Sequence, residues 1–158
     1  MDDGHLWGEL LIIILLVLAN GACSLAEIAI VGARKTKLQE MIDAGSKNAV
    51  YALRLAEKKE ELFSTIQVGI TTISIITGMF SGASLAGPLG RELEKIPFLA
   101  PYAQGVSMVT VMVLVTYFSL IIGELVPKWV AIAIPEKAAC AIARPMILLA
   151  TVCRPLVL

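Results

Sequence analysis

The sequence Gly123-Glu124-Leu125-Val126-Pro127-Lys128 closes a long apolar run and contains the only carboxylate of that run. A proline inside a helix has no N–H, so Pro127 should leave the carbonyl of Gly123 without its helical partner. Lipid can hydrate neither that oxygen nor the Glu124 carboxylate, so both must face protein, water or an ion. Two interpretations follow: a cation site, or a kinked helix end in which Glu124 pairs with Lys128 at i,i+4.

The composition around this stretch is that of an integral membrane protein. Of 158 residues, 58% are hydrophobic, the mean hydropathy is +0.83 and the formal net charge is zero. The length suits a single domain over residues 1–158, and the neutral charge does not suggest a nucleic-acid surface. The only histidine, His5, precedes the first apolar run, so no Ser/His or Cys/His nucleophile pair can form in the membrane. We therefore do not expect an enzyme.

Three segments are long and apolar enough to cross about 30 Å of hydrocarbon. They cover about residues 10–33, 62–86 and 102–127. Between the first two, the charge density and the helical spacing of apolar residues predict two amphipathic helices broken at Gly45, with the next serine as N-cap. These helices either lie along the membrane surface or form a soluble connector.

The later connections contain glycine and proline. A turn-rich connection is predicted from Gly87 onward, before the third span. After it, a helix over about residues 135–154 starts at a proline and is interrupted at Pro145 and Pro155. It is apolar, but short and partly charged, so a juxtamembrane helix is favoured over a fourth span.

Positive charge predicts the orientation of the spans. Of the 13 Lys and Arg residues, none precedes the first span, seven lie between the first and second, two lie between the second and third, and four follow Glu124. Positively charged loops stay in the cytoplasm. The N-terminus is therefore expected outside, with the amphipathic helices and the C-terminus inside.

Polar residues inside the spans should face neighbouring helices. Asn20, Ser24 and Glu27 lie near one stripe of the first span, which is typical of interhelical hydrogen bonding. The second span has many hydroxyl groups, and its Gly78-x-x-x-Gly82 spacing indicates a packing or dimer surface first and oxygen ligation second. One carboxylate, many hydroxyls and a freed carbonyl suit hard cations such as Mg²⁺, Ca²⁺ or Na⁺ better than zinc or copper.

Three motifs resemble the transmembrane domain of the CorC/CNNM family of magnesium transporters. They are Ala19-Asn20-Gly21-Ala22-Cys23-Ser24-Leu25-Ala26-Glu27-Ile28-Ala29-Ile30, Gln67-Val68-Gly69-Ile70-Thr71, and the Gly123–Lys128 stretch followed by Pro135-Glu136. The resemblance covers nearly the whole chain and implies an all-α homodimer in the inner (plasma) membrane, each protomer having three spans and a juxtamembrane helix. The implied function is Mg²⁺ export, coupled to Na⁺ entry, with the ion between the helices.

The resemblance also implies which residues bind the ion, through hydroxyl, backbone and carboxylate oxygens. Carried onto this chain, the metal ligands are Ser24, Gly69, Thr71, Ser74, Gly123 and Glu124. Structural or gating roles are expected for Asn20, Glu27, Pro127 and Lys128. Family members usually continue into nucleotide-binding cytoplasmic CBS domains. This chain stops at Leu158, so we expect an isolated transmembrane module, and its sequence is no basis for predicting nucleotide regulation.

Two other functions fit the same residues. The polar stripes could only hold a dimer together in a membrane-anchoring or assembly module, or they could line a channel that passes Mg²⁺ passively. An intramembrane enzyme is disfavoured, because a lone carboxylate without a paired acid, a histidine or a metal cluster lacks the partners that such chemistry needs.

Overall fold

The computed structural model describes residues 3–157, and these residues form helices and short connections without a β-strand. In chain order the elements are α1 (Asp3–Gly32), α2 (Lys35–Asp43), α3 (Lys47–Glu57), α4 (Lys59–Glu94), the 3₁₀ turn η1 (Ala100–Tyr102), α5 (Ala103–Leu120), the π-helical turn η2 (Ile121–Leu125), α6 (Val126–Ala133) and α7 (Pro135–Val157). The all-α class that the sequence predicts is confirmed.

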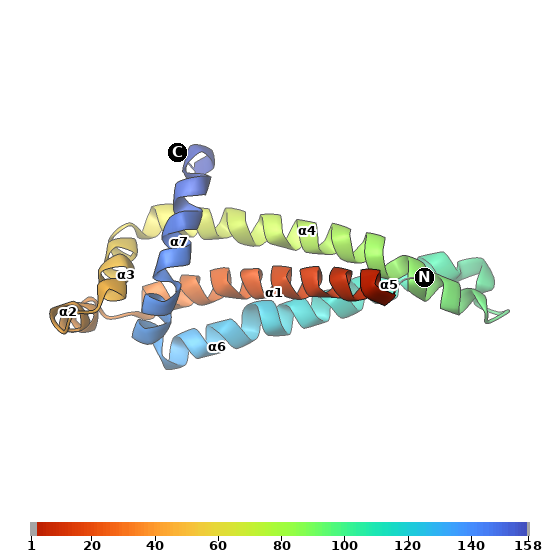
Figure 1. The fold of residues 1–158 in the computed structure, drawn as a ribbon, viewed down its shortest axis with the longest axis horizontal. Coiled ribbons are helices and arrows are strands. Elements are labelled where there is room, and N and C mark those ends of the chain that lie inside the picture. The colour runs from red at the N-terminus through yellow and green to blue at the C-terminus, as the bar shows by residue number, and fades with distance from the viewer. Residues whose placement is uncertain (1–2, 158) are drawn as a thin grey trace.

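Three long helical segments lie side by side and make the body of the molecule (Figure 1). They are α1, α4 and the continuous run α5–η2–α6, and α1 contacts both of the others. The short helices α2 and α3 lie at one end of this bundle. Helix α7 runs across the same end and contacts α1, α3 and α4.

Among residues 3–157, four helical segments are long and apolar enough to cross a membrane by length and composition: residues 4–32, 59–94, 100–133 and 135–156. Figure 1 shows that the fourth, α7, crosses the direction shared by the other three. If the first three segments cross a bilayer, α7 therefore runs parallel to the plane of that bilayer. The juxtamembrane position of α7 stays a prediction that this arrangement favours.

The helices run further than the sequence predicts, and several of the differences involve a proline. Helix α4 does not end at Gly87 but continues through Pro88 to Glu94. Its packing against α5 is close there, since a Cβ built on Gly90 would lie 3.2 Å from the Ser107 hydroxyl oxygen. Neighbouring helices can compensate for the hydrogen bond that a proline removes.

Two further boundaries differ for the same reason. The third long helix passes Pro127 and ends only at Ala133. Helix α7 is not interrupted at Pro145 or Pro155, so that prediction is wrong. Its inner face is held by packing, because Ala143 is fully buried and lies in one hydrophobic cluster with residues of α1 and α3.

That hydrophobic cluster joins α3 and α7 to the end of α1 through small side chains. Ala26, Ala29, Ala49 and Ala139 are fully buried in it. Alanine allows helix axes to approach closely, which is how membrane helices gain packing energy. The break before α3 is also confirmed, because the Ser46 side chain accepts a hydrogen bond from the Ala49 N–H at 3.4 Å.

Candidate cation-binding site

The predicted site lies at the π-helical turn that interrupts the third long helix. In η2 the Val126 N–H bonds the carbonyl of Ile121, five residues earlier. Pro127 follows directly and can donate no backbone bond at all. A widened turn next to a missing donor leaves backbone oxygens that must find partners elsewhere, and π turns are common at functional sites for this reason.

The Gly123 carbonyl finds its partners on α1. It accepts hydrogen bonds from Asn20 Nδ2 and from Ser24 Oγ, each at 3.1 Å. Ser24 is fully buried, so its hydroxyl has no access to bulk water. The polar stripe of the first span therefore faces the π turn, and Asn20 and Pro127 lie beside it.

Two glycines allow this close approach between α1 and η2. A Cβ built on Gly21 would lie 3.0 Å from the ring of Pro127 and 3.3 Å from the Ile122 carbonyl oxygen. A Cβ on Gly123 would lie 3.2 Å from the Val17 carbonyl oxygen. Such contacts with backbone atoms are tighter than side chains normally make, so larger residues would separate the two elements.

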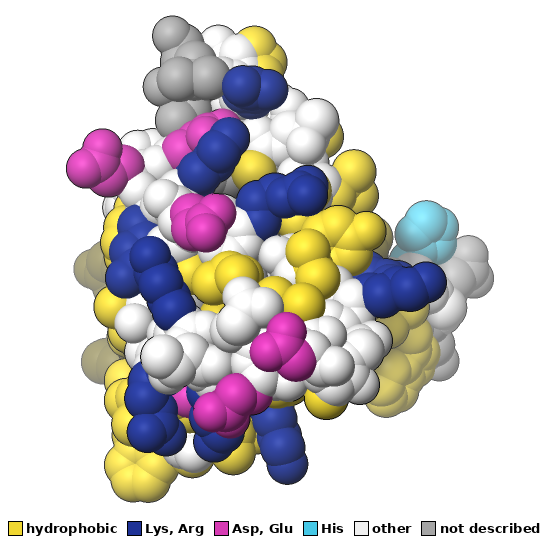
Figure 2. Space-filling model, turned by 90° about the vertical axis from the view of Figure 1, so that its left-hand side faces the viewer, with side chains coloured by type: hydrophobic (Ala, Val, Ile, Leu, Met, Phe, Trp, Pro, Cys, Tyr) yellow, Lys and Arg dark blue, Asp and Glu magenta, His cyan; other side chains and the backbone are white. Residues whose placement is uncertain are grey.

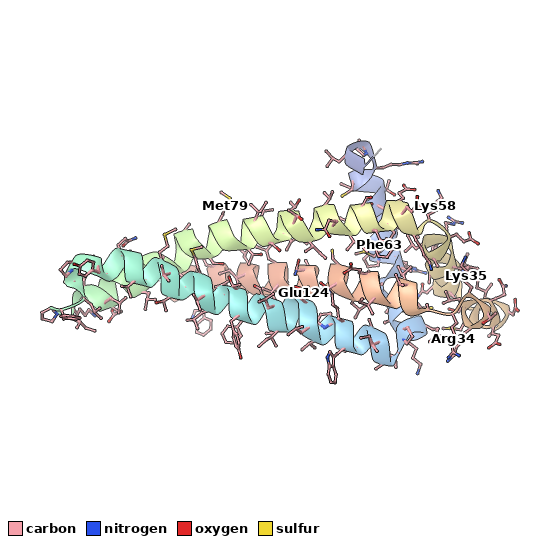
Figure 3. All side chains as sticks on the ribbon, turned by 180° about the vertical axis from the view of Figure 1, so that it is seen from behind. Arg34, Lys35, Lys58, Phe63, Met79 and Glu124 are labelled. Carbon is pink, nitrogen blue, oxygen red and sulfur yellow. The ribbon has the colours of Figure 1, made fainter. Side chains whose placement is uncertain are left out.

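An ion-paired cluster lies on the other side of the turn. The Lys128 ammonium is 2.9 Å from Glu124 Oε1 and 3.8 Å from Glu27 Oε2. The i,i+4 pair that the plainer interpretation predicted is therefore present together with the freed carbonyl. One ammonium between two carboxylates leaves a net charge of −1 (+1 − 2), which attracts cations. Figure 3 labels Glu124 in the middle part of the bundle.

A hollow of about 180 Å³ with both polar and apolar lining residues lies between α1, α4 and α5–η2, next to Glu124. Its polar lining residues are Asn20, Ser74, Thr77, Thr116, Ser119 and Glu124. Asn20 Oδ1 and Ser119 Oγ are buried and have no hydrogen-bond partner among the described residues. An unpaired buried polar atom costs about 1–3 kcal/mol, and both of these oxygens can accept a hydrogen bond or contact a cation.

The structure brings together four of the six predicted ligands. Ser74 and Glu124 line the hollow, and Ser24 bonds Gly123 directly behind Asn20. The other two lie elsewhere. A Cβ on Gly69 would lie 3.4 Å from Cys23 Sγ and from a Leu149 methyl group, so Gly69 serves packing between α1, α4 and α7. Thr71 is exposed on α4 and does not line the hollow.

Three hydroxyl residues of the hollow are not among the predicted ligands: Thr77, Thr116 and Ser119. Thr77 Oγ1 donates to the Ile73 carbonyl at 2.7 Å, which leaves its lone pairs free to accept. Thr116 and Ser119 are three residues apart, so they share a helix face. The π turn shifts that face relative to Glu124, and counting 3.6 residues per turn back from Glu124 therefore misses them.

Comparisons with known proteins agree with the motifs. Residues 11–158 match the Cyclin M transmembrane N-terminal domain (CNNM). A UPF0053 protein of Synechocystis is 45% identical over 149 residues, which are 94% of this chain and 33% of that protein. The polyamine export protein of Escherichia coli K12 is 29% identical over 149 residues, again 94% of this chain and 33% of that protein.

A further relative has the same name. The polyamine export protein of Haemophilus influenzae is 29% identical over 157 residues, covering 97% of this chain and 35% of that protein. The chain thus spans about a third of the length of the curated relatives that it matches.

Proposed function

Since this chain belongs to the CNNM transmembrane-domain family and is a multi-pass membrane protein, we propose that it forms the membrane pathway of a Mg²⁺ exporter in the plasma membrane. The observation that carries the proposal is the group of oxygen-bearing side chains that meet in the hollow at the π turn. Two of its buried oxygens have no donor, and its carboxylate is held by a lysine that a metal ion can displace.

The chemistry of these groups suits Mg²⁺. Glu124 supplies one carboxylate, Asn20 an amide oxygen, and Ser74 and Ser119 hydroxyl oxygens. Mg²⁺ prefers such hard oxygens and keeps several of its waters, so few charged ligands suffice. No group of three or more His, Cys, Asp or Glu that could hold a metal occurs among the described residues, which disfavours a tight transition-metal centre.

Export of a divalent cation needs an energy source. Moving two charges outward against 100 mV costs about 4.6 kcal/mol, twice the cost for one charge. Sodium entry supplies energy of this kind, so we propose Na⁺-coupled exchange by a homodimer. Na⁺ is also a hard cation and can use the same carboxylate when Mg²⁺ has left.

A second candidate substrate is a polyamine. Two of the relatives are named polyamine export proteins, and a specific contact of this chain fits that chemistry. The Lys128 ammonium binds the carboxylates of Glu124 and Glu27, so these groups already accept a primary ammonium. An organic polycation with several such groups could take the place of Lys128.

The test is the variant Glu124→Gln, with Glu92→Gln as the control. Glu92 also pairs with a lysine, but at the far end of α4. We expect Glu124→Gln to weaken Mg²⁺ binding by about tenfold or more, ~1.4 kcal/mol, because hydroxyls cannot replace the lost charge. Titration calorimetry of the purified protein measures this, and unchanged affinity would reject the site.

Two further measurements separate the alternatives. Calorimetry with spermidine in place of Mg²⁺ decides the substrate, since binding of spermidine alone favours the polyamine. Mg²⁺ flux in proteoliposomes, measured with and without a sodium gradient, decides the mechanism. Flux that follows the membrane potential without sodium indicates a channel, and no flux in either condition indicates an anchoring or assembly module.

A further inference from the structure

A second hollow lies where α3, the start of α4 and the later part of α7 meet, at the end of the bundle that carries the short helices. It has a volume of about 270 Å³. Its charged lining residues are Arg54, Lys58, Glu61 and Arg154. Figure 2 views this end of the molecule and shows Lys and Arg side chains spread over it between apolar patches. Figure 3 labels Lys58 beside α7.

The charges that line this hollow do not balance one another. Three cations face one carboxylate, which leaves a net charge of +2 (3 − 1). The pair between Arg154 Nε and Glu61 Oε1 is long, at 4.0 Å, and Arg154 is 63% exposed. Arg54 and Lys58 make no ion pair or side-chain hydrogen bond with the part of the chain that the structure describes. Guanidinium and ammonium donors in this number suit a phosphate group.

Apart from Thr151, the remaining lining residues of the hollow are apolar. Leu55, Leu62, Ile147 and Ala150 line it beside the charged groups. Leu62 is also the first residue of the predicted second span, whereas Lys58 precedes that span by four positions. The hollow therefore lies where α4 enters the bilayer, with cations toward water and apolar side chains toward lipid. A ligand that fits both walls has an anionic phosphate head and a hydrocarbon body.

We propose that this hollow binds the headgroup phosphate of an anionic phospholipid, with the glycerol and upper acyl chain against Leu62 and Ile147. Lys and Arg near a membrane surface contribute about 1 kcal/mol each toward anionic lipids. Arg54 and Lys58 come from the end of α3, and Arg154 comes from α7. The lipid would thus connect these helices, and its binding is independent of cation transport.

The experiment compares thermal unfolding of the full chain in nanodiscs of phosphatidylcholine alone and of phosphatidylcholine with phosphatidylglycerol. We expect a higher unfolding temperature with phosphatidylglycerol. The triple variant Arg54→Gln, Lys58→Gln, Arg154→Gln should lose this difference. The control triple variant Lys37→Gln, Lys47→Gln, Lys137→Gln removes the same charge from exposed positions outside the hollow and should keep it.

Three results would overturn the proposal. They are no difference between the two lipid compositions for the unmodified chain, equal loss in both triple variants, and equal stabilisation by inorganic phosphate in phosphatidylcholine nanodiscs. Equal loss in both triple variants would mean that phosphatidylglycerol acts through surface charge in general. Equal stabilisation by inorganic phosphate would mean that the ligand is a free anion. If the triple variant does not fold, the single variant Arg54→Gln, at an exposed position, takes its place. It should reduce the difference in unfolding temperature between the two lipid compositions.

Discussion

At the scale of single residues, Lys128 decides how much negative charge the candidate site offers to a cation. Its ammonium lies 2.9 Å from Glu124 and 3.8 Å from Glu27, so an incoming cation must compete with a charge that belongs to the chain. We expect Lys128→Met to tighten Mg²⁺ binding by about tenfold, ~1.4 kcal/mol. Titration calorimetry measures the change.

The control for this prediction is Lys95→Met. Lys95 pairs with Glu92 at 2.7 Å at the far end of α4, so its removal should leave Mg²⁺ affinity unchanged. Weaker binding in Lys128→Met would contradict the competition and would mean that Lys128 supports the bound state.

The contact at Gly123 gives a second prediction for a single residue. Gly123→Ala would bring a Cβ to 3.2 Å from the Val17 carbonyl oxygen and 3.3 Å from Asn20 Nδ2, and a backbone oxygen cannot move aside alone. The change should separate η2 from α1, lower stability by about 1–3 kcal/mol and weaken cation binding. Thermal unfolding and calorimetry on one preparation measure both effects.

Gly105→Ala is the matched control, because a Cβ on Gly105 meets nothing within 4 Å. This variant should leave the free energy of unfolding unchanged or raise it by about 0.5–1 kcal/mol, because glycine inside a helix is less favourable than alanine. If Gly123→Ala and Gly105→Ala change stability equally, the close approach of α1 to η2 does not contribute to stability.

Sequence reasoning found the residues of this site that follow from spacing within one helix. The stripe of Asn20 and Ser24, and the pair of Glu124 and Lys128, need only 3.6 residues per turn. Ser119 was missed because the π turn changes the helical phase between it and Glu124. The contacts of Gly69 with Cys23 and Leu149 depend on how three helices pack, which no local pattern contains.

At the scale of elements, the third long helix changes from α-helix (α5) to a π-helical turn (η2) and back to α-helix (α6) next to Pro127. Pro127→Ala would add an N–H that can bond the Gly123 carbonyl, four residues earlier, in competition with Asn20 and Ser24. We expect stability to hold or rise and Mg²⁺ affinity to fall. Thermal unfolding and calorimetry on the same preparation check this.

Pro145→Ala is the control, since Pro145 also lies inside a helix but in α7, away from the site. It should leave Mg²⁺ affinity unchanged. If Pro127→Ala melts at a lower temperature and keeps the affinity of the unmodified chain, the proline serves packing and does not free a carbonyl for the ion.

Element boundaries were the least accurate part of the sequence prediction, and the errors share a cause. A proline inside a helix in water costs about 3 kcal/mol, so Pro88, Pro145 and Pro155 were expected to end or interrupt helices. Helices packed against neighbours in a low-dielectric environment keep their remaining hydrogen bonds, because lipid offers no replacement. The existence of the long helices could be predicted, but neither where they end nor the π turn inside the third one.

At the scale of the whole molecule, two glycines of α4 have open space around them. A Cβ on Gly78 or Gly82 meets nothing within 4 Å, whereas Gly21, Gly90 and Gly123 are each packed against another helix. Gly78 lines the hollow between α1, α4 and α5, so its space belongs to the candidate site. Gly82 remains from the Gly78-x-x-x-Gly82 spacing that the sequence predicts for dimerisation.

We expect Gly82→Leu to convert the dimer to a monomer, because a large side chain blocks close approach of two backbones. Gly105→Leu is the control, since Gly105 is equally open but lies on α5. Light scattering coupled to size-exclusion chromatography in detergent gives the mass. A dimer that persists in Gly82→Leu would place the interface elsewhere.

The hydrogen bond from Asn20 to Gly123 joins residues that are 103 positions apart. During biosynthesis Asn20 is therefore made well before the residue whose carbonyl it binds. A ribosome that adds about 5–20 residues per second needs about 5 to 20 seconds to make the intervening chain. During that time α1 carries an amide and a hydroxyl whose acceptor has not yet been synthesised, and lipid offers none. The first helix should therefore remain at the insertion machinery until the π turn emerges, so that α1, α4 and α5 enter the bilayer together.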